Sequence, residues 1–240
     1  MSAAGVSKAA ASDLGDAVRD ILPAQVAAVP IGLLFGAVAA TKGLSVAEVA
    51  LMSATVFAGG AQLAVIEVWG TPVPVAAILF ATLLVNLRHV LMGASLAPKL
   101  GSFRRPQRAT VLFTLTDETW AFAERRAAAG RRLSPAYLGT MGAMLWLNWV
   151  ACSALGAALG PLLGDPRRLG ADFAFTALFI GLVAGLWRGR STARVVAASA
   201  VAAALAYRWF GAPWHVAAGA FAGIGARALA WRPRAGEAAP

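Results

Sequence analysis

Long apolar runs recur along this chain of 240 residues, and they constrain its fold more than any other feature. A helix that crosses the roughly 30 Å hydrocarbon core of a bilayer needs about 20 apolar residues, the length that several of these runs reach. They are rich in Ala, Leu and Gly and lack the short alternating segments of an outer-membrane barrel, so helices are expected rather than strands. The fold class is therefore predicted as all-α, a polytopic integral membrane protein with about six to eight membrane helices, some of them broken or re-entrant.

The positions of the apolar residues predict where the chain crosses the membrane. In the first run, residues 21–40, Pro30 followed by Gly32 and Gly36 predicts a kink or a close approach of another helix. The later uninterrupted runs are residues 75–100, 136–163, 173–187, 193–210 and 214–231.

Two further segments differ from these runs because each is short or interrupted. Residues 45–70 hold two apolar halves separated by Gly59-Gly60, and residues 110–123 carry Asp117 and Glu118. If each segment enters the membrane and returns, both basic loops, the later arginine loop at residues 188–194 and both termini are cytoplasmic, as the positive-inside rule favours. Seven or eight full crossings would put the two basic loops on opposite sides. The sequence leaves both topologies open.

The distribution of charged residues along the chain predicts its domain organisation and membrane lipid as a partner. Residues 1–20 are predicted to form a cytoplasmic, amphipathic N-terminus, residues 21–232 a single transmembrane transport domain, and residues 233–240 a disordered tail. The formal net charge of +10 comes from arginine clusters between apolar runs. That pattern is typical of cytoplasmic loops beside anionic lipid, so membrane lipid is expected as a partner and nucleic acid is not.

Small residues at four-residue spacing mark one late helix. Gly219 and Gly223 lie on a single face of the run at residues 214–231. Such a face packs closely against another helix, either of this chain or of a partner subunit.

The glycine-rich break in residues 45–70 is the first candidate for a transport site. Irregular backbone at membrane depth survives only inside protein or beside a wet cavity. Gly59 and Gly60 would free N–H groups at the positive end of a following half-helix, which suits a carboxylate, and Gln62 adds a donor and an acceptor. The alternative is a tight glycine contact between helices, with Gln62 as a packing residue.

Asn86-Leu87-Arg88-His89 is the second candidate, because it places an arginine near the middle of an apolar run. Such an arginine costs about 2.5–3.5 kcal/mol and should face an acidic partner inside the protein. The possible partners are Glu67, Asp117 and Glu118. The residues predicted to handle charge or protons are therefore Arg88, His89, Glu67 and Asp117. A structural ion pair beside a neutral core histidine is the alternative.

Two more groups complete the predicted site. Asp117 and Glu118 point about 100° apart in a helix, so one can receive a substrate ammonium while the other pairs, unless both merely start a helix at the membrane edge. Trp146 and Asn148 can wall a pocket and hydrogen-bond across helices, unless the tryptophan belongs to an interfacial belt. The predicted substrate-binding residues are Gly59, Gly60, Gln62, Asn86, Asp117, Glu118, Trp146 and Asn148.

The residues present do not predict an enzyme. The sequence has no nucleotide-binding glycine pattern, no paired-histidine metal spacing and no nucleophile elbow. His89 and His215 are the only histidines and Cys152 the only cysteine, so no metal, cofactor or intrachain disulfide is expected.

These segments resemble the AzlC family of branched-chain amino-acid exporters, the azaleucine-resistance or YgaZ-type permeases. The resemblance covers residues 21–163, with a weaker tail at 171–179. The matching motifs are Pro30-Ile31-Gly32 through Gly36, Phe57-Ala58-Gly59-Gly60-Ala61-Gln62, Asn86-Leu87-Arg88-His89-Val90-Leu91-Met92-Gly93-Ala94-Ser95-Leu96-Ala97-Pro98, and Thr116-Asp117-Glu118-Thr119-Trp120-Ala121.

The resemblance implies the large subunit of a permease that works with a small AzlD-type membrane subunit and exports valine, leucine or isoleucine. Without a nucleotide motif, the expected activity is secondary-active, proton-coupled export across the bacterial inner membrane. The alternative from another class is a scaffold or assembly subunit whose polar residues only pair helices, with transport performed by a partner.

Overall fold

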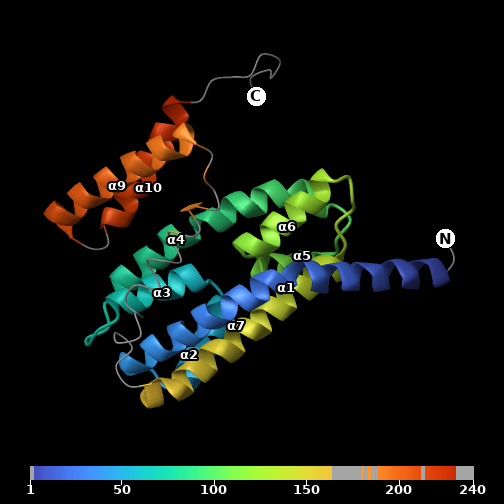
Figure 1. Ribbon diagram of the computed structural model, residues 1–240, viewed down its shortest axis with the longest axis horizontal. Coiled ribbons are helices and arrows are strands. Elements are labelled where there is room, and N and C mark those ends of the chain that lie inside the picture. Colours follow the sequence, from blue (N-terminus) through green and yellow to red (C-terminus); the bar gives the residue numbers. More distant parts are fainter. Residues whose placement is uncertain are drawn as a thin grey trace. The chain divides into compact units, whose positions relative to one another are not determined.

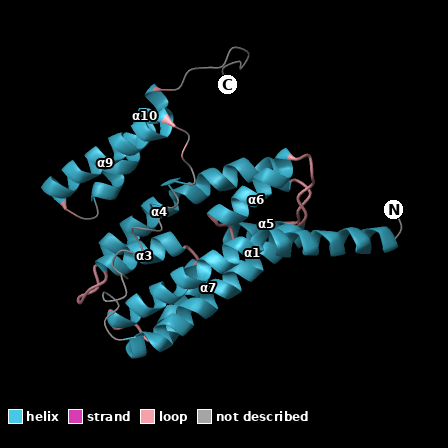
Figure 2. Cartoon of the chain, in the orientation of Figure 1, coloured by secondary structure: helices cyan, strands magenta, loops and turns pink. Residues whose placement is uncertain are grey.

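The computed structural model describes residues 3–163, 180, 183–184, 187, 189–211 and 214–230, and all of its regular elements are helices (Figure 2). The all-α prediction is thereby confirmed. The predicted span at residues 173–187 falls almost wholly outside the described residues, and the predicted tail at 233–240 does so entirely.

The helices follow the predicted apolar runs closely (Figure 1). They are α1 (Ala3–Thr41), α2 (Val46–Val56), α3 (Gly59–Val68), α4 (Val75–Leu96), the 3₁₀ turn η1 (Ala97–Leu100), α5 (Arg105–Phe113), α6 (Asp117–Ala128), α7 (Pro135–Leu163), α9 (Arg190–Phe210) and α10 (Trp214–Leu229). α1 is continuous through residue 20, so no helix break marks the predicted N-terminal segment.

Four of the described helices contain segments long and apolar enough to cross a membrane: Ser12–Thr41, Val75–Leu100, Pro135–Gly160 and Arg190–Phe210. α2 and α3 are apolar but have only 11 and 10 residues, so each reaches about halfway across a hydrocarbon core of about 30 Å. The chain is a polytopic membrane protein that combines long helices with short apolar ones.

By their contacts the described helices fall into two compact units, residues 1–74 with 85–174 and residues 75–84 with 175–240. In the first unit α1 and α7 lie side by side along most of their length (Figure 1). Glycines bring the two backbones together: a Cβ on Gly36 would overlap the Ser153 carbonyl group, and one on Gly156 would overlap that of Leu33. The close approach predicted at Gly36 is confirmed.

The first broken segment is interrupted slightly earlier than predicted. α2 ends at Val56 and α3 begins at Gly59, so Phe57 and Ala58 form the break and the glycines open the second half-helix. Phe57 has a φ of 42°, in the left-handed region that side chains other than glycine rarely adopt. Its side chain is only 5% exposed, and we attribute its tolerance of this conformation to that burial.

The second broken segment, α5 and α6 with the turn at Thr114–Thr116, returns to the level at which it starts. Lys99, in η1 just before α5, has its Nζ 2.6 Å from Oε1 of Glu124 in the last turns of α6. α5 and α6 have 9 and 12 residues, so neither can cross a bilayer alone. The end of α6 therefore lies beside the turn that precedes α5.

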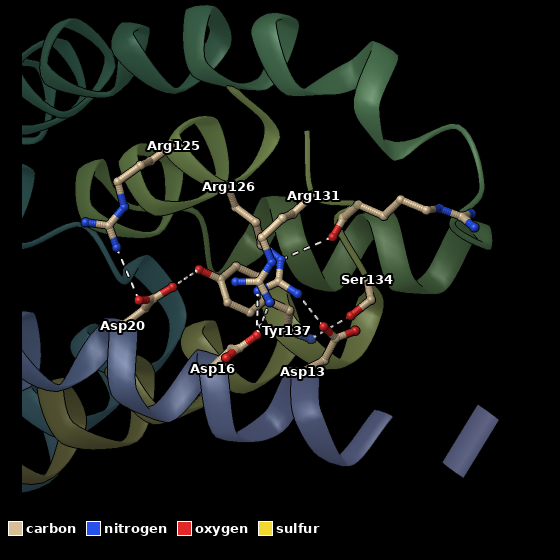
Figure 3. A network of polar contacts seen from close by, with 9 residues as sticks. Asp13, Asp16, Asp20, Arg125, Arg126, Arg131, Ser134 and Tyr137 are labelled. Atoms are coloured by element: carbon tan, nitrogen blue, oxygen red, sulfur yellow. Dashed lines mark hydrogen bonds and ion pairs between the residues drawn. The ribbon is translucent and has the colours of Figure 1, made fainter. Parts of the chain in front are cut away.

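Acidic residues of α1 fix which end of this unit the arginines occupy (Figure 3). The Arg126 side chain, 6% exposed, pairs with Asp13 and lies 3.0 Å from Asp16, while Arg125 lies 3.2 Å from Asp20. We call this the arginine end: the start of α1, η1, the end of α6 and the loop before α7. The ion pair with Asp16 also raises the pKa of Arg131, which therefore stays charged.

The position of the arginine end indicates where the first broken segment, α2 and α3, begins. α1 starts there and extends about 30 Å beyond Asp20, whereas α4, one continuous helix, finishes there at η1. Thr41, at the end of α1, consequently lies far from the arginine end, and α2 begins on that side. Whether the two broken segments re-enter the membrane or cross it stays a prediction.

The second unit pairs α9 with α10. A Cβ on Gly219 would lie 3.2 Å from the carbonyl oxygen of Ser199, and one on Gly223 would overlap the Ser199 hydroxyl. The small-residue face of α10 therefore packs against another helix of this chain. Phe80 and Trp214 have ring centroids 5.3 Å apart within the same unit.

Candidate functional site

One face of α7 supports the turning points of both broken segments. Thr114, at the turn of α5 and α6, fills the space that a Cβ on Gly142 would need. Gly59, at the start of α3, faces the Trp149 indole, and a Cβ there would lie 2.9 Å from the ring. Residues seven apart on a helix share a face and are separated by about 10 Å along the axis. The two turns therefore meet the middle of α7 at neighbouring positions.

A buried hydrogen-bond network joins the first turn to α7. Gln62 is 0% exposed; its Nε2 donates to Ser53 Oγ at 3.1 Å, and its Oε1 accepts from Trp149 Nε1 at 2.8 Å. The Ser153 hydroxyl lies 2.7 Å from both Ser53 Oγ and the Trp149 carbonyl. Phe35 stacks on the indole with a centroid separation of 6.1 Å. Both halves of the broken helix are thus held against α7 by polar contacts.

Trp146 and Asn148 each donate a hydrogen bond to a neighbouring helix, as was expected of Asn148. Trp146 Nε1 donates to the Ala54 carbonyl at 3.0 Å, near the end of α2, where the last carbonyls have no partner within the helix. Asn148 Nδ2 donates to the Gln25 carbonyl of α1 at 3.1 Å, and Cys152 Sγ lies 3.5 Å from Asn148 Oδ1. Both side chains therefore connect α7 to its neighbours.

The half-helix that begins at Gly59 has no capping side chain. Its N-cap residue, Ala58, makes no side-chain hydrogen bond, and the first backbone bond is from Gln62 N to Ala58 O, at 2.9 Å. This positive helix end is the predicted carboxylate site. The Trp149 ring lies against Gly59, beside this helix end.

The second turn carries an intramembrane ion pair. Arg88, in the middle of α4, pairs with Asp117, the first residue of α6. Asp117 also lies at the positive end of that helix, which favours a carboxylate. The two side chains are 34% and 37% exposed, so the pair is partly accessible. Of the three predicted partners of Arg88, the structure selects Asp117.

The remaining residues predicted to handle charge or protons differ in their distance from the Arg88–Asp117 pair. Asn86 Oδ1, Arg88 Nε and His89 Nδ1 are buried atoms without a hydrogen-bond partner among the described residues, and all three belong to one stretch of α4. Glu118 is exposed beside Asp117 on α6, whereas Glu67 is exposed near the end of α3. The unpaired atoms of α4 leave hydrogen-bonding capacity next to the ion pair.

A second polar cluster aligns α4 with α6 on the arginine side of the ion pair. Trp120 Nε1 donates to Ser95 Oγ at 2.8 Å, and that hydroxyl lies 3.0 Å from Oε1 of Glu124. Lys99 Nζ contacts both oxygens of the same carboxylate, at 2.6 and 2.7 Å. These contacts fix α6 along α4 and so position Asp117 opposite Arg88.

Comparison with known proteins identifies the family of this chain. A family model described as AzlC protein matches residues 23–163, more than half of the chain. The chain belongs to the AzlC family. The matched region contains both broken segments and α7, and membership is consistent with a transport-related role in a membrane.

Two AzlC-like relatives carry only general names. A protein of Archaeoglobus fulgidus, named an uncharacterized membrane protein, is 34% identical over 188 residues, which cover 76% of this chain and 80% of the relative. One of Haemophilus influenzae with the same name is 27% identical over 165 residues, 67% of this chain and 66% of that protein. No solved structure matches the chain.

Sequence reasoning missed several residues that hold this AzlC site together. Ser53 and Ser153 anchor the buried network, and Gly142 receives Thr114. A serine inside an apolar helix was the available signal for the first two. Within the described residues, no group of three or more His, Cys, Asp or Glu side chains is arranged to hold a metal ion.

Proposed function

We propose that this protein is a secondary-active, proton-coupled exporter of branched-chain amino acids in the bacterial inner membrane, acting with a small AzlD-like membrane subunit. The observation that carries the proposal is the Arg88–Asp117 ion pair at the turn of a broken segment. Charged side chains at this depth are costly and mark substrate or ion pathways. Family membership and the helical architecture support a transporter rather than an enzyme.

The chemistry of the ion pair matches the charged groups of an amino acid. A substrate carboxylate can replace Asp117 as the partner of Arg88, while its ammonium replaces Arg88 as the partner of Asp117. Bidentate contact with a carboxylate is the strongest pairing that a guanidinium makes. Asn86 and His89 would then offer their unpaired atoms to the same ligand. Glu118 and Glu67 remain candidates for carrying the coupled proton.

The broken helix at Gly59 would control access in this scheme. The Trp149 indole contacts Gly59 and Gln62, and Trp146 and Asn148 hold the same stretch of α7. Because the indole lies against Gly59, whereas the Arg88 side chain is 34% exposed, the geometry favours Arg88 as the first partner of the carboxylate. The indole and its neighbours would wall the apolar side chain of the substrate.

Efflux of leucine from loaded vesicles tests the proposal. Asp117→Asn and Arg88→Gln should each abolish flux, and the exchanged variant Arg88→Asp with Asp117→Arg should restore folding but not transport, because the substrate groups then meet the reversed pair. Arg105→Gln, an exposed arginine at the start of α5, is the matched control. Full flux in Asp117→Asn would contradict the assignment.

Two further arms of that assay separate the finer claims. Glu118→Gln alone should retain more flux than Asp117→Asn, because Glu118 is exposed whereas Asp117 is paired. Vesicles with and without a pH gradient, and with and without the small subunit, report on coupling and partnership. Flux that follows the small subunit alone, with no amino acid bound by this chain, would favour the scaffold hypothesis.

A further inference from the structure

A cavity of about 360 Å³ opens at the arginine end, away from the Arg88–Asp117 pair. It lies between the turn that follows α4 and the loop that joins α6 to α7. The lining residues that matter for binding are Lys99, Gly101 and Ser102 from the first segment, and Gly130, Arg131 and Arg132 from the second.

The polar lining of this cavity is cationic, with no acidic side chain in it. Lys99 forms an ion pair with Glu124, and Arg131 forms one with Asp16. Neither of these two carboxylates lines the cavity. Arg132 differs, because its exposed guanidinium has no hydrogen bond or ion pair within the described chain, although its carbonyl accepts from Arg126 Nε at 3.2 Å. In the cavity, the unpaired Arg132 guanidinium therefore lies beside two cations that are already ion-paired, Lys99 and Arg131.

The surroundings add to this positive field. Residues 99–132 contain eight basic side chains, whereas four carboxylates pair with them, namely Asp13, Asp16, Asp20 and Glu124. Several arginines consequently have no acidic partner, and Arg132 is the one that lines the cavity. A concave surface with this excess attracts anions from a distance.

The position of the cavity matches the depth of lipid headgroups. Lys99 lies at the end of the apolar segment Val75–Leu100, and Arg132 lies just before the segment Pro135–Gly160. Both segments thus reach the membrane surface on either side of the cavity. Gly101 and Gly130 leave space there, since a Cβ on Gly130 would meet no atom within 4 Å. Basic pockets between membrane helices suit phosphate-bearing headgroups.

We propose that this cavity binds a phosphate-bearing anion, supplied by the headgroup of an anionic lipid, with Arg132 as its principal partner and Lys99, Arg131 and Ser102 around it. The site is separate from the proposed transport site and does not depend on it. Free phosphate offers the same oxygens, so the test must distinguish the two sources.

The test compares Arg132→Gln with Arg105→Gln, which removes the same charge at the same end of the molecule but outside the cavity. Purified protein in neutral detergent is titrated with phosphatidylglycerol, with phosphatidylcholine and with inorganic phosphate. Bound lipid is counted by native mass spectrometry, and circular dichroism confirms that each variant is folded. Arg132→Lys, which keeps the charge but loses the planar fork, is a third variant.

We expect Arg132→Gln to weaken phosphatidylglycerol binding about fivefold, as expected for one basic residue near an anionic surface, and Arg105→Gln to change it far less. Arg132→Lys should retain part of the binding. Saturable binding of inorganic phosphate with the same dependence on Arg132 would support the site with a soluble source. Equal losses in the two glutamine variants, or no preference for phosphatidylglycerol over phosphatidylcholine together with no phosphate binding, would overturn the proposal.

Discussion

The hydrogen bond between Gln62 and Trp149 should carry a measurable share of the stability of the turn in the first broken segment. The bond, 2.8 Å from Trp149 Nε1 to Gln62 Oε1, joins a side chain of α3 that is 0% exposed to one of α7 that is 7% exposed. Gln62→Leu would also remove the bond to Ser53 and leave the indole N–H buried without a partner.

The structure allows the size of this effect to be estimated. Hydrogen bonds between membrane helices contribute about 0.6 kcal/mol on average and about 1.7 at most. Gln62→Leu loses two of them, and a buried donor left without a partner costs roughly 1–3 kcal/mol. The variant should therefore lose about 2–4 kcal/mol of unfolding free energy. Part of this loss should vanish when the indole is already absent.

A double-mutant cycle with Trp149→Phe isolates that part. Unfolding by dodecyl sulfate in mixed micelles, followed by circular dichroism, should give a coupling free energy of about 1 kcal/mol between positions 62 and 149. The matched cycle with Trp146→Phe should be additive, because the Trp146 indole donates to the Ala54 carbonyl and not to Gln62. A coupling below about 0.3 kcal/mol in the first cycle would refute the reasoning.

Two shorter predictions concern the same turn and the topology. Gly59→Ala should cost about 1–3 kcal/mol of unfolding free energy in the same assay, because the Trp149 ring is held by Phe35 and Gln62, whereas Gly139→Ala on α7, where a Cβ meets no atom within 4 Å, should be neutral. The topology can be tested with single cysteines in a Cys152→Ser background and an impermeant maleimide. Lys42→Cys and Thr71→Cys, which flank α2 and α3, should react from one side of the membrane, and Ser102→Cys should react from the other side. Labelling of Lys42→Cys and Thr71→Cys from opposite sides would show that this segment crosses fully.

Features that depend on apolar length could be predicted from the sequence. The ends of α4, α7, α9 and α10 fall within a few residues of the predicted runs, because the length of a membrane helix is set locally by the bilayer thickness. Arginine clusters are also local signals, and their sidedness is biased by a general rule, but they leave the re-entrant and the fully crossing topologies open.

Features that depend on tertiary contacts could be predicted only in part. The need of Arg88 for an acid was predictable from desolvation, but the choice among Glu67, Asp117 and Glu118 depends on how α6 lies along α4. The exact break in the first segment was misplaced because glycine is the usual residue for a left-handed conformation, whereas Phe57 adopts it here. Gly59 is needed instead for the approach of Trp149, a contact between residues 90 positions apart.

If the Arg88–Asp117 pair is the receptor for substrate, its charges predict a specific selectivity. The pair is neutral as a whole, so a zwitterion can exchange with it and leave no net charge at membrane depth. 3-Methylbutylamine, leucine without its carboxylate, would satisfy Asp117 but leave Arg88 unpaired, at a cost of roughly 2.5–3.5 kcal/mol. 4-Methylpentanoate, leucine without its ammonium, would leave Asp117 unpaired instead. Both analogues should therefore inhibit leucine efflux at least about a hundredfold more weakly than valine or isoleucine. Equal inhibition by the amine and by valine would show that the substrate carboxylate does not meet Arg88.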